Sequence, residues 1–173
     1  MSEKEKLGKI VGGQNVFEER EILEEYSGDL SFAPRVRPRY VVKPENAKQV
    51  KNIVEWANET LTPLVPVSSG PPHFRGDSVP SVGGAVIVDL SRMKRIIRVD
   101  PQNRVAMVEP GVTFAELQPA LEKAGMCAYM PLCPRRTKSV IGSMLEREPV
   151  IMPLYQWDAL DPLTCIEVIF ITR

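Results

Sequence analysis

The chain has few of the residues that metal sites and disulfide frameworks need. It holds a single histidine, His73, and three irregularly spaced cysteines, Cys127, Cys133 and Cys165, with no CxxC pair. An odd, irregular set of cysteines argues against a disulfide framework, and a lone histidine offers zinc no ligand set. We therefore predict no metal site and three reduced, mostly buried thiols in a cytoplasmic protein.

Long apolar runs and an excess of either charge are also missing. The 22 basic residues balance the 22 acidic ones, so the basic footprint of a nucleic-acid-binding protein is absent. No apolar run approaches the roughly 18 residues of a membrane span, and the charged start MSEKEKLGKI lacks the apolar core of a signal peptide. With 173 residues, 43% apolar and 25% charged, the composition is that of a soluble globular protein of about one domain.

Apolar periodicity predicts strands and helices in mixed order. Asn46, with Gln49 three residues later, has the pattern of a helix-capping box, and the segment 100–103 has the pattern of a tight turn. Strands are predicted at 40–43, 63–67, 85–90, 95–99, 104–110 and 164–170, and helices at 15–26, 44–61, 114–125 and 139–148. This order indicates an α+β fold with a mixed sheet.

The helix predicted at 114–125 has its own start and stop signals. Thr113 is expected to cap its N-terminus and Gly125 to end it. Pro119 lies inside the pattern, so a kink or a late start is expected.

The stretch PVSSGPPHFRGD, residues 66–77, follows a predicted strand and contains the lone histidine. The three successive amides at 68–70 can form an anion-binding nest, whereas Pro71 and Pro72 have no N–H to offer. Arg75 could pair with a phosphate. From these residues alone, a phosphate cradle and a rigid surface turn both remain open. For His73, three roles remain open: hydrogen bonding within the loop, donation to a ligand, or covalent attachment to a cofactor.

A second small-residue stretch, SVIGS at 139–143, precedes a predicted helix. It could present amides to a ligand or be an ordinary helix start. No Ser/His/Asp set, Walker loop or GxGxxG occurs, so no catalytic residue is assigned.

Several stretches, in order and spacing, resemble the FAD-binding domain of the vanillyl-alcohol oxidase / p-cresol methylhydroxylase (PCMH-type) superfamily. The branch that they resemble contains FAD-linked glycolate oxidase subunits and D-lactate dehydrogenases. The stretches are YVVKPENAKQVKNIVEWANE running into PLVPVSSG, then GGAVIVDLSRMKRIIRVDPQNRVAMVEPGVTFAELQPALEKAG, SVIGSML and DALDPLTCIEVIF, with IVGGQNVFEEREILEEYSGDLS as an N-terminal lead-in.

The resemblance implies two α/β subdomains that hold FAD between them. It implies a helical lead-in at 1–36, a first subdomain at 37–92 and a second, incomplete one at 93–173. The implied chemistry is hydride transfer from a small substrate, often a 2-hydroxy acid, to flavin N5. The implied pyrophosphate loop is 67–77, a Pro-Gly pair lies near the flavin, and a small-residue turn follows. The expected cofactor-binding residues are Val67, Ser68, Ser69, Gly70, His73, Phe74, Arg75, Gly76, Asp77, Pro110, Gly111, Ser139, Gly142 and Ser143.

The chain departs from the family pattern in two places. The loop is glycine-poor, and the position at which some relatives attach FAD through histidine falls at Pro72, one place before His73. Covalent attachment is therefore not expected.

The second departure is that the chain ends at Arg173, before the adenine-contacting residues and the substrate-binding cap domain of the family. We expect a second chain or a missing C-terminal part to complete the FAD domain and the substrate site. Two alternatives remain open: a non-catalytic scaffold or assembly subunit that lacks flavin, and the remnant of a truncated gene.

Overall fold

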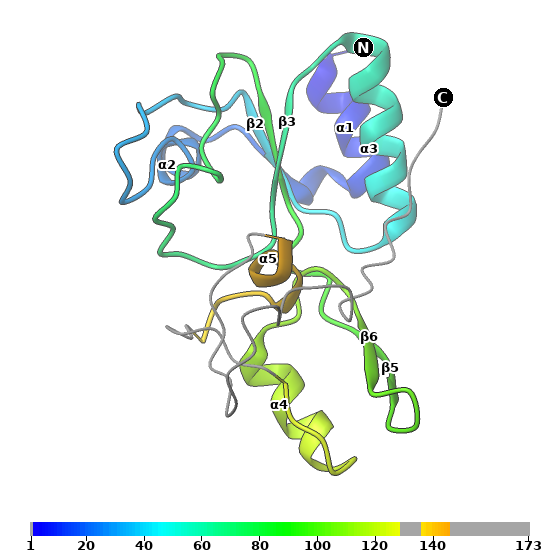
Figure 1. Cartoon of the computed structure of the whole chain (residues 1–173). Coiled ribbons are helices and arrows are strands. Elements are labelled where there is room, and N and C mark those ends of the chain that lie inside the picture. Colours follow the sequence, from blue (N-terminus) through cyan, green and yellow to red (C-terminus); the bar gives the residue numbers. More distant parts are fainter. Residues whose placement is uncertain (1, 129–135, 146–173) are drawn as a thin grey trace. The chain divides into compact units, whose positions relative to one another are not determined.

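The computed structural model of the chain describes residues 2–128 and 136–145. The chain divides into two compact units, Met1–Met93 and Lys94–Arg173 (Figure 1). The strand predicted at 164–170 and the stretch DALDPLTCIEVIF lie outside the described residues. In the part of the chain that is described, none of the helices combines the length and the apolar character that crossing a membrane requires.

The first unit contains a mixed four-stranded sheet, as predicted. Its strands are β1 (Val16–Phe17), β2 (Tyr40–Val42), β3 (Leu64–Val67) and β4 (Val86–Asp89), in the order β1-β2-β4-β3. Strands β2, β3 and β4 are parallel to one another, and β1 runs antiparallel to β2. Central strand β4 is buried throughout, as its unbroken apolar run indicates for a parallel strand covered on both faces. The three parallel strands therefore end at one common edge.

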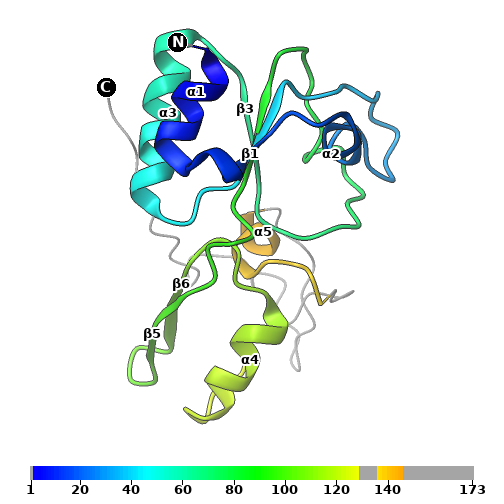
Figure 2. The same ribbon diagram turned by 180° about the vertical axis from the view of Figure 1, so that it is seen from behind.

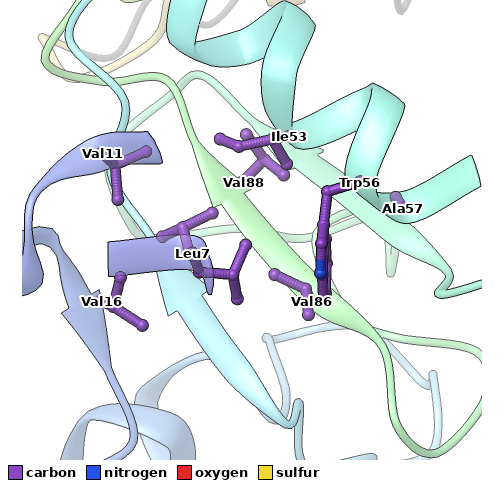
Figure 3. Packing of buried hydrophobic residues seen from close by; sticks show 9 residues of the cluster. Leu7, Val11, Val16, Ile53, Trp56, Ala57, Val86 and Val88 are labelled. Atoms are coloured by element: carbon purple, nitrogen blue, oxygen red, sulfur yellow. The ribbon is translucent and has the colours of Figure 1, made fainter. Parts of the chain in front are cut away.

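Helices cover both faces of this sheet. α1 (Glu3–Val11) and α3 (Ala47–Thr60) lie side by side on one face, and α2 (Arg20–Glu25) lies on the other (Figures 1 and 2). The α1 and α3 side chains pack against β4 in the main core, which contains Leu7, Val11, Val16, Val42, Ile53, Trp56, Ala57, Val86 and Val88 (Figure 3). The α2 side chain Leu23 packs on the opposite face with Val41, Val67 and Ile87.

The N-terminal cap predicted for α3 is confirmed. The Asn46 Oδ1 atom accepts a hydrogen bond from the Gln49 amide at 3.0 Å. The Gln49 side chain does not return to Asn46, as a capping box would require, but accepts from the Glu45 amide at 2.7 Å. Helix α3 therefore begins where the sequence predicts. The Gln49 side chain also provides a hydrogen-bond acceptor for the Glu45 amide, just before the helix.

The N-terminal region differs from the prediction. The helix predicted from residue 15 is wrong at its start, because Val16 and Phe17 pair with β2 and α2 begins at Arg20. A β-branched and an aromatic residue gain more from this pairing and half-burial than from a helical turn. The resemblance implied a helical lead-in at 1–36, but periodicity predicted no helix at α1, although Ser2 and Glu5 form a reciprocal capping box at its start.

The second unit begins with an antiparallel hairpin of β5 (Ile96–Asp100) and β6 (Val105–Val108), as predicted. In the turn, the Asp100 Oδ1 atom accepts from the amides of Gln102 and Asn103 at 3.1 Å each. α4 (Phe114–Glu122) packs its buried apolar face against the hairpin, and α5 (Val140–Leu145) follows. That core contains Val112, Phe114, Leu117, Leu121 and Val140, with Ile96, Val99, Ala106 and Val108 packed against it.

Two local expectations in the second unit have clear outcomes. Helix α4 begins directly after the predicted cap Thr113, so the late start that Pro119 could impose does not occur. The thiol of Cys127 is free and exposed, so the prediction of burial is wrong for this cysteine, which lies in the segment after α4. Cys133 and Cys165 fall outside the described residues.

Candidate cofactor-binding site

The predicted pyrophosphate loop leaves the sheet at the edge where the parallel strands end. Val67, the last residue of β3, stands in register with Asp89 of β4, and its carbonyl accepts a hydrogen bond from the Leu90 amide at 2.7 Å. Ser69 is buried directly after this strand end. In open sheets with parallel strands, ligands bind beyond the carboxyl ends of the strands. The fold thus places the nest predicted at 68–70 where such a ligand is expected.

The second half of the loop is held by another part of the same unit, residues 27–36. Pro71 and Pro72 are exposed and joined by a cis peptide bond. Beyond them, the His73 carbonyl accepts from the Leu30 amide at 2.9 Å. The Gly76 amide, one of the donors predicted for the phosphate, donates instead to the Asp29 Oδ2 atom at 2.7 Å.

Gly76 is required at this point for two reasons. Its φ is +74°, in the region that side-chain-bearing residues rarely adopt. A Cβ atom here would lie 2.8 Å from the Cβ of Ala33 and 3.2 Å from the Oγ of Ser31. This glycine therefore permits the close contact between the loop and residues 27–36.

The Asp29 carboxylate has both of its oxygens engaged. Its Oδ1 atom accepts from the Ser31 amide at 2.9 Å, and its Oδ2 atom accepts from Gly76. Desolvation alone would raise the pKa of Asp29, but the hydrogen bonds from Ser31 and Gly76 and the nearby His73 outweigh it and lower the pKa. Asp29 is therefore a charged acceptor at neutral pH.

A buried polar cluster, which was not predicted from the sequence, lies at the same edge of the sheet. Asp89 is 3% exposed. Its Oδ2 atom accepts from the Tyr26 hydroxyl at 2.8 Å and lies 3.1 Å from the Lys43 Nζ, and its Oδ1 atom accepts from the Ser91 amide at 2.9 Å. The Lys43 Nζ also lies 5.5 Å from the centre of the Phe17 ring, within the range of a cation–π contact. The cluster ties the residues that directly follow α2 and β2 to the last residue of β4, beside the loop.

The electrostatics of this cluster favour a charged aspartate. Burial alone would raise the pKa of Asp89, but the hydrogen bonds from Ser91 and Tyr26 and the charge of Lys43 lower it. Burial and the neighbouring carboxylate raise the pKa of Tyr26, which stays a neutral donor. The sequence signal was an acidic residue, Asp89, within the otherwise apolar run AVIVDL, since a buried carboxylate requires partners.

In the second unit, the predicted Pro-Gly pair at 110–111 and the predicted small-residue stretch at 139–143 come together. The Val140 amide donates to the Val112 carbonyl at 2.9 Å, and Thr113 and Ser139 form an isolated antiparallel bridge. The Ser139 Oγ accepts from the Gly142 amide at 2.9 Å, which caps α5. The Pro-Gly pair at 110–111 and the turn at 139–143 are therefore neighbours within this unit.

An ion pair between the exposed Arg95 and the buried Glu109 fixes the backbone just before Pro110. The Glu109 carboxylate accepts from the Arg95 amide and Nε at 2.8 Å each and lies 2.7 Å from its Nη2. Burial alone would raise the pKa of Glu109, but these contacts lower it. The two main chains also pair here, because the Glu109 amide donates to the Arg95 carbonyl at 2.9 Å. This pairing holds the entry to the predicted flavin turn.

Comparison with known proteins identifies the family. Residues 38–147 match the FAD binding domain family, and the chain belongs to it. The chain is 27% identical over 146 residues to the 4-cresol dehydrogenase [hydroxylating] flavoprotein subunit of Pseudomonas putida, a match that covers 83% of this chain and 28% of that one. It is 30% identical over 144 residues to the glycolate oxidase subunit GlcD of Bacillus subtilis, a match that covers 83% of this chain and 30% of that one.

Solved structures agree with this assignment. The structure of p-cresol methylhydroxylase with substrate bound matches with a TM-score of 0.73 and 27% identity, over 84% of this chain and 29% of that one. A 4-ethylphenol oxidase from Gulosibacter chungangensis matches with a TM-score of 0.69 and 25% identity, over 82% of this chain and 28% of that one. The predicted fold class and the resemblance to PCMH-type flavoproteins are confirmed, and FAD is the cofactor of the family. The chain spans less than a third of the length of these relatives.

Proposed function

We propose that this chain forms part of an FAD-dependent oxidoreductase that oxidises a small 2-hydroxy acid. Bound FAD supplies the hydride acceptor, flavin N5, and the protein binds and orients it. The observation that carries the proposal is the position of the loop 67–77, at the carboxyl edge of three parallel strands in a chain of the FAD binding domain family. Relatives named glycolate oxidase subunit, D-2-hydroxyglutarate dehydrogenase and D-lactate dehydrogenase support the substrate class.

The proposed binding residues of the loop fit a diphosphate by their chemistry. Ser68, Ser69 and Gly70 supply successive amides and two hydroxyls, and Arg75 supplies a cation, which are the groups that bind phosphate. Within the second unit, the neighbouring stretches 110–111 and 139–143 are proposed to contact the flavin end. We propose subdomains at 37–92 and 93–173, with 1–36 as a lead-in, and the full set of binding residues is Val67, Ser68, Ser69, Gly70, His73, Phe74, Arg75, Gly76, Asp77, Pro110, Gly111, Ser139, Gly142 and Ser143.

A second chain or a further polypeptide segment is proposed to complete the FAD domain and the substrate site. The small share of each relative that the chain covers supports this, as do relatives named as subunits. We place the complex in the cytoplasm. The alternative function is a non-catalytic assembly subunit, and it is favoured by Pro71 and Pro72, two residues without an amide in the middle of the loop.

Anaerobic flavin reduction tests the proposal. The purified protein, with any chain that co-purifies, is loaded with FAD and mixed without oxygen with glycolate, D-lactate or D-2-hydroxyglutarate. Loss of the visible flavin absorbance is expected with at least one of them, because hydride transfer reduces the ring. Bleaching by 4-cresol alone would assign a phenolic substrate instead. Bound FAD that none of these compounds reduces would favour the assembly subunit.

A further inference from the structure

Residues 27–36 form a closed segment whose base is anchored near the sheet. The Val36 amide donates to the Ser27 carbonyl at 2.8 Å, which brings the two ends of the segment together. Directly before it, the hydroxyl of Tyr26 donates to buried Asp89. The base is therefore fixed to the edge of the sheet from which the loop 67–77 leaves.

The interior of this segment is ordered by its own hydrogen bonds. The Ser31 amide donates to the Asp29 Oδ1 atom, and the Ala33 amide donates to the Ser31 Oγ at 3.0 Å. Such side-chain-to-backbone bonds fix tight turns. Contacts within the segment itself therefore hold the Asp29 carboxylate in place, independently of its contact with the loop.

Three contacts join the segment to the part of the loop beyond the two prolines. Leu30 donates to the His73 carbonyl, Gly76 donates to Asp29 across 47 residues of sequence, and Gly76 packs closely against Ala33. Pro71 and Pro72 have no amide to bind anything. The second half of the loop is therefore held in its conformation by residues 27–36.

We propose that Asp29 is a positioning residue for FAD: its carboxylate holds residues 73–76 in the conformation that receives the cofactor. This inference rests on the proposed function. Asp29 acts through the Gly76 amide, since both of its oxygens are occupied by backbone donors. A ligand binds with an apparent affinity reduced by the fraction of the protein in the competent conformation. Loss of the contact between Asp29 and Gly76 should therefore weaken FAD binding, even though no contact between the protein and FAD is removed.

The test compares Asp29→Ala and Asp29→Asn with wild type. FAD affinity is titrated by flavin fluorescence, and hydrogen exchange of the Gly76 amide is followed in the FAD-free protein. We expect Asp29→Ala to weaken FAD binding about 10- to 100-fold, the range for losing a hydrogen bond to a charged group, and to speed Gly76 exchange. Asp29→Asn keeps a neutral acceptor, so its FAD affinity and its Gly76 exchange rate should both lie between those of Asp29→Ala and wild type.

Asp100→Ala is the matched control. Asp100 also accepts two backbone amides in a turn and also has a lowered pKa, through the hydrogen bonds from Asn103, but it lies in the hairpin of the second unit. We expect it to leave FAD affinity and Gly76 exchange unchanged. An equal loss of affinity in Asp100→Ala would assign the effect to general destabilisation and overturn the inference.

The Gly70→Val variant separates failure of this inference from failure of the proposed function. If Gly70→Val loses FAD while Asp29→Ala keeps it, Asp29 does not position the loop, but the FAD site stands. Unchanged Gly76 exchange in Asp29→Ala also overturns the inference. If all of these variants bind FAD like wild type, the loop is not the FAD site, and both the binding residues proposed in the loop and the inference about Asp29 are wrong.

Discussion

Replacement of Gly70 by valine is expected to weaken FAD binding by about 100-fold or more. A branched side chain at 70 blocks the close backbone approach that a nest needs. Losing two hydrogen bonds to a charged diphosphate, at roughly 1.5 kcal/mol each, already corresponds to this factor. The measurement is an FAD titration of the purified protein, with any co-purifying chain, by flavin fluorescence.

Gly83→Val is the matched control for this variant. Gly83 also lies in a loop, and a Cβ atom added to it would meet nothing within 4 Å and would not be strained by a positive φ. It precedes β4, at the amino edge of that strand, so its replacement should leave FAD affinity unchanged. Gly70→Ala should fall between valine and wild type. If Gly70→Val binds FAD with wild-type affinity, the loop is not part of the FAD site.

Replacement of Asp89 by alanine is expected to lower the free energy of unfolding of the first unit by about 3 kcal/mol, as for breaking a buried ion pair by removing one partner. The change leaves the half-buried Lys43 and the Tyr26 hydroxyl without their acceptor. Denaturant unfolding can be followed through Trp56, which lies in the core of the same unit. A loss below roughly 0.5 kcal/mol, typical of surface changes, would contradict the role of the cluster.

The pH dependence of Asp89→Asn tests the charge itself. Because the folded-state pKa of Asp89 is lowered, its contribution is fully present above the ordinary value of 3.8 and is lost as pH falls through the folded pKa. Wild type should therefore be more stable than Asp89→Asn at neutral pH, and the difference should shrink below pH 3.8. Equal stability of the two proteins at neutral pH would show that the charge of Asp89 contributes nothing.

Local signals in the sequence predicted most of the described elements. The parallel strands are short β-branched runs, and α3 has both an apolar face and the Asn46 cap, so each could be recognised within a few residues. The error at Val16 and Phe17 has a non-local cause: a two-residue strand exists because β2 pairs with it. The missed helix α1 had a local signal, the capping box of Ser2 and Glu5.

The loop of the candidate site was predicted from the sequence, but the side-chain contacts that hold it were not. The sequence predicted a loop after the strand that ends at 67, and the family resemblance implied its cofactor, whereas the position of the loop at the carboxyl edge comes from the strand pairing in the structure. The contact of Asp29 with Gly76 joins positions 47 residues apart, and a pair so distant cannot be predicted from the periodicity of the sequence. The cluster at Asp89 likewise joins residues that follow α2 and β2 to the end of β4, so only the fold reveals which partners meet the buried carboxylate.

The most direct test of the account is an FAD titration of the thermal unfolding of the purified protein, together with any chain that elutes with it. A ligand that binds only the folded state stabilises it, by about 2.7 kcal/mol at 100 times its Kd. We expect a Tm that rises with FAD concentration and a visible flavin spectrum in the complex. A colourless protein whose Tm does not change with added FAD would show that the chain does not bind this cofactor.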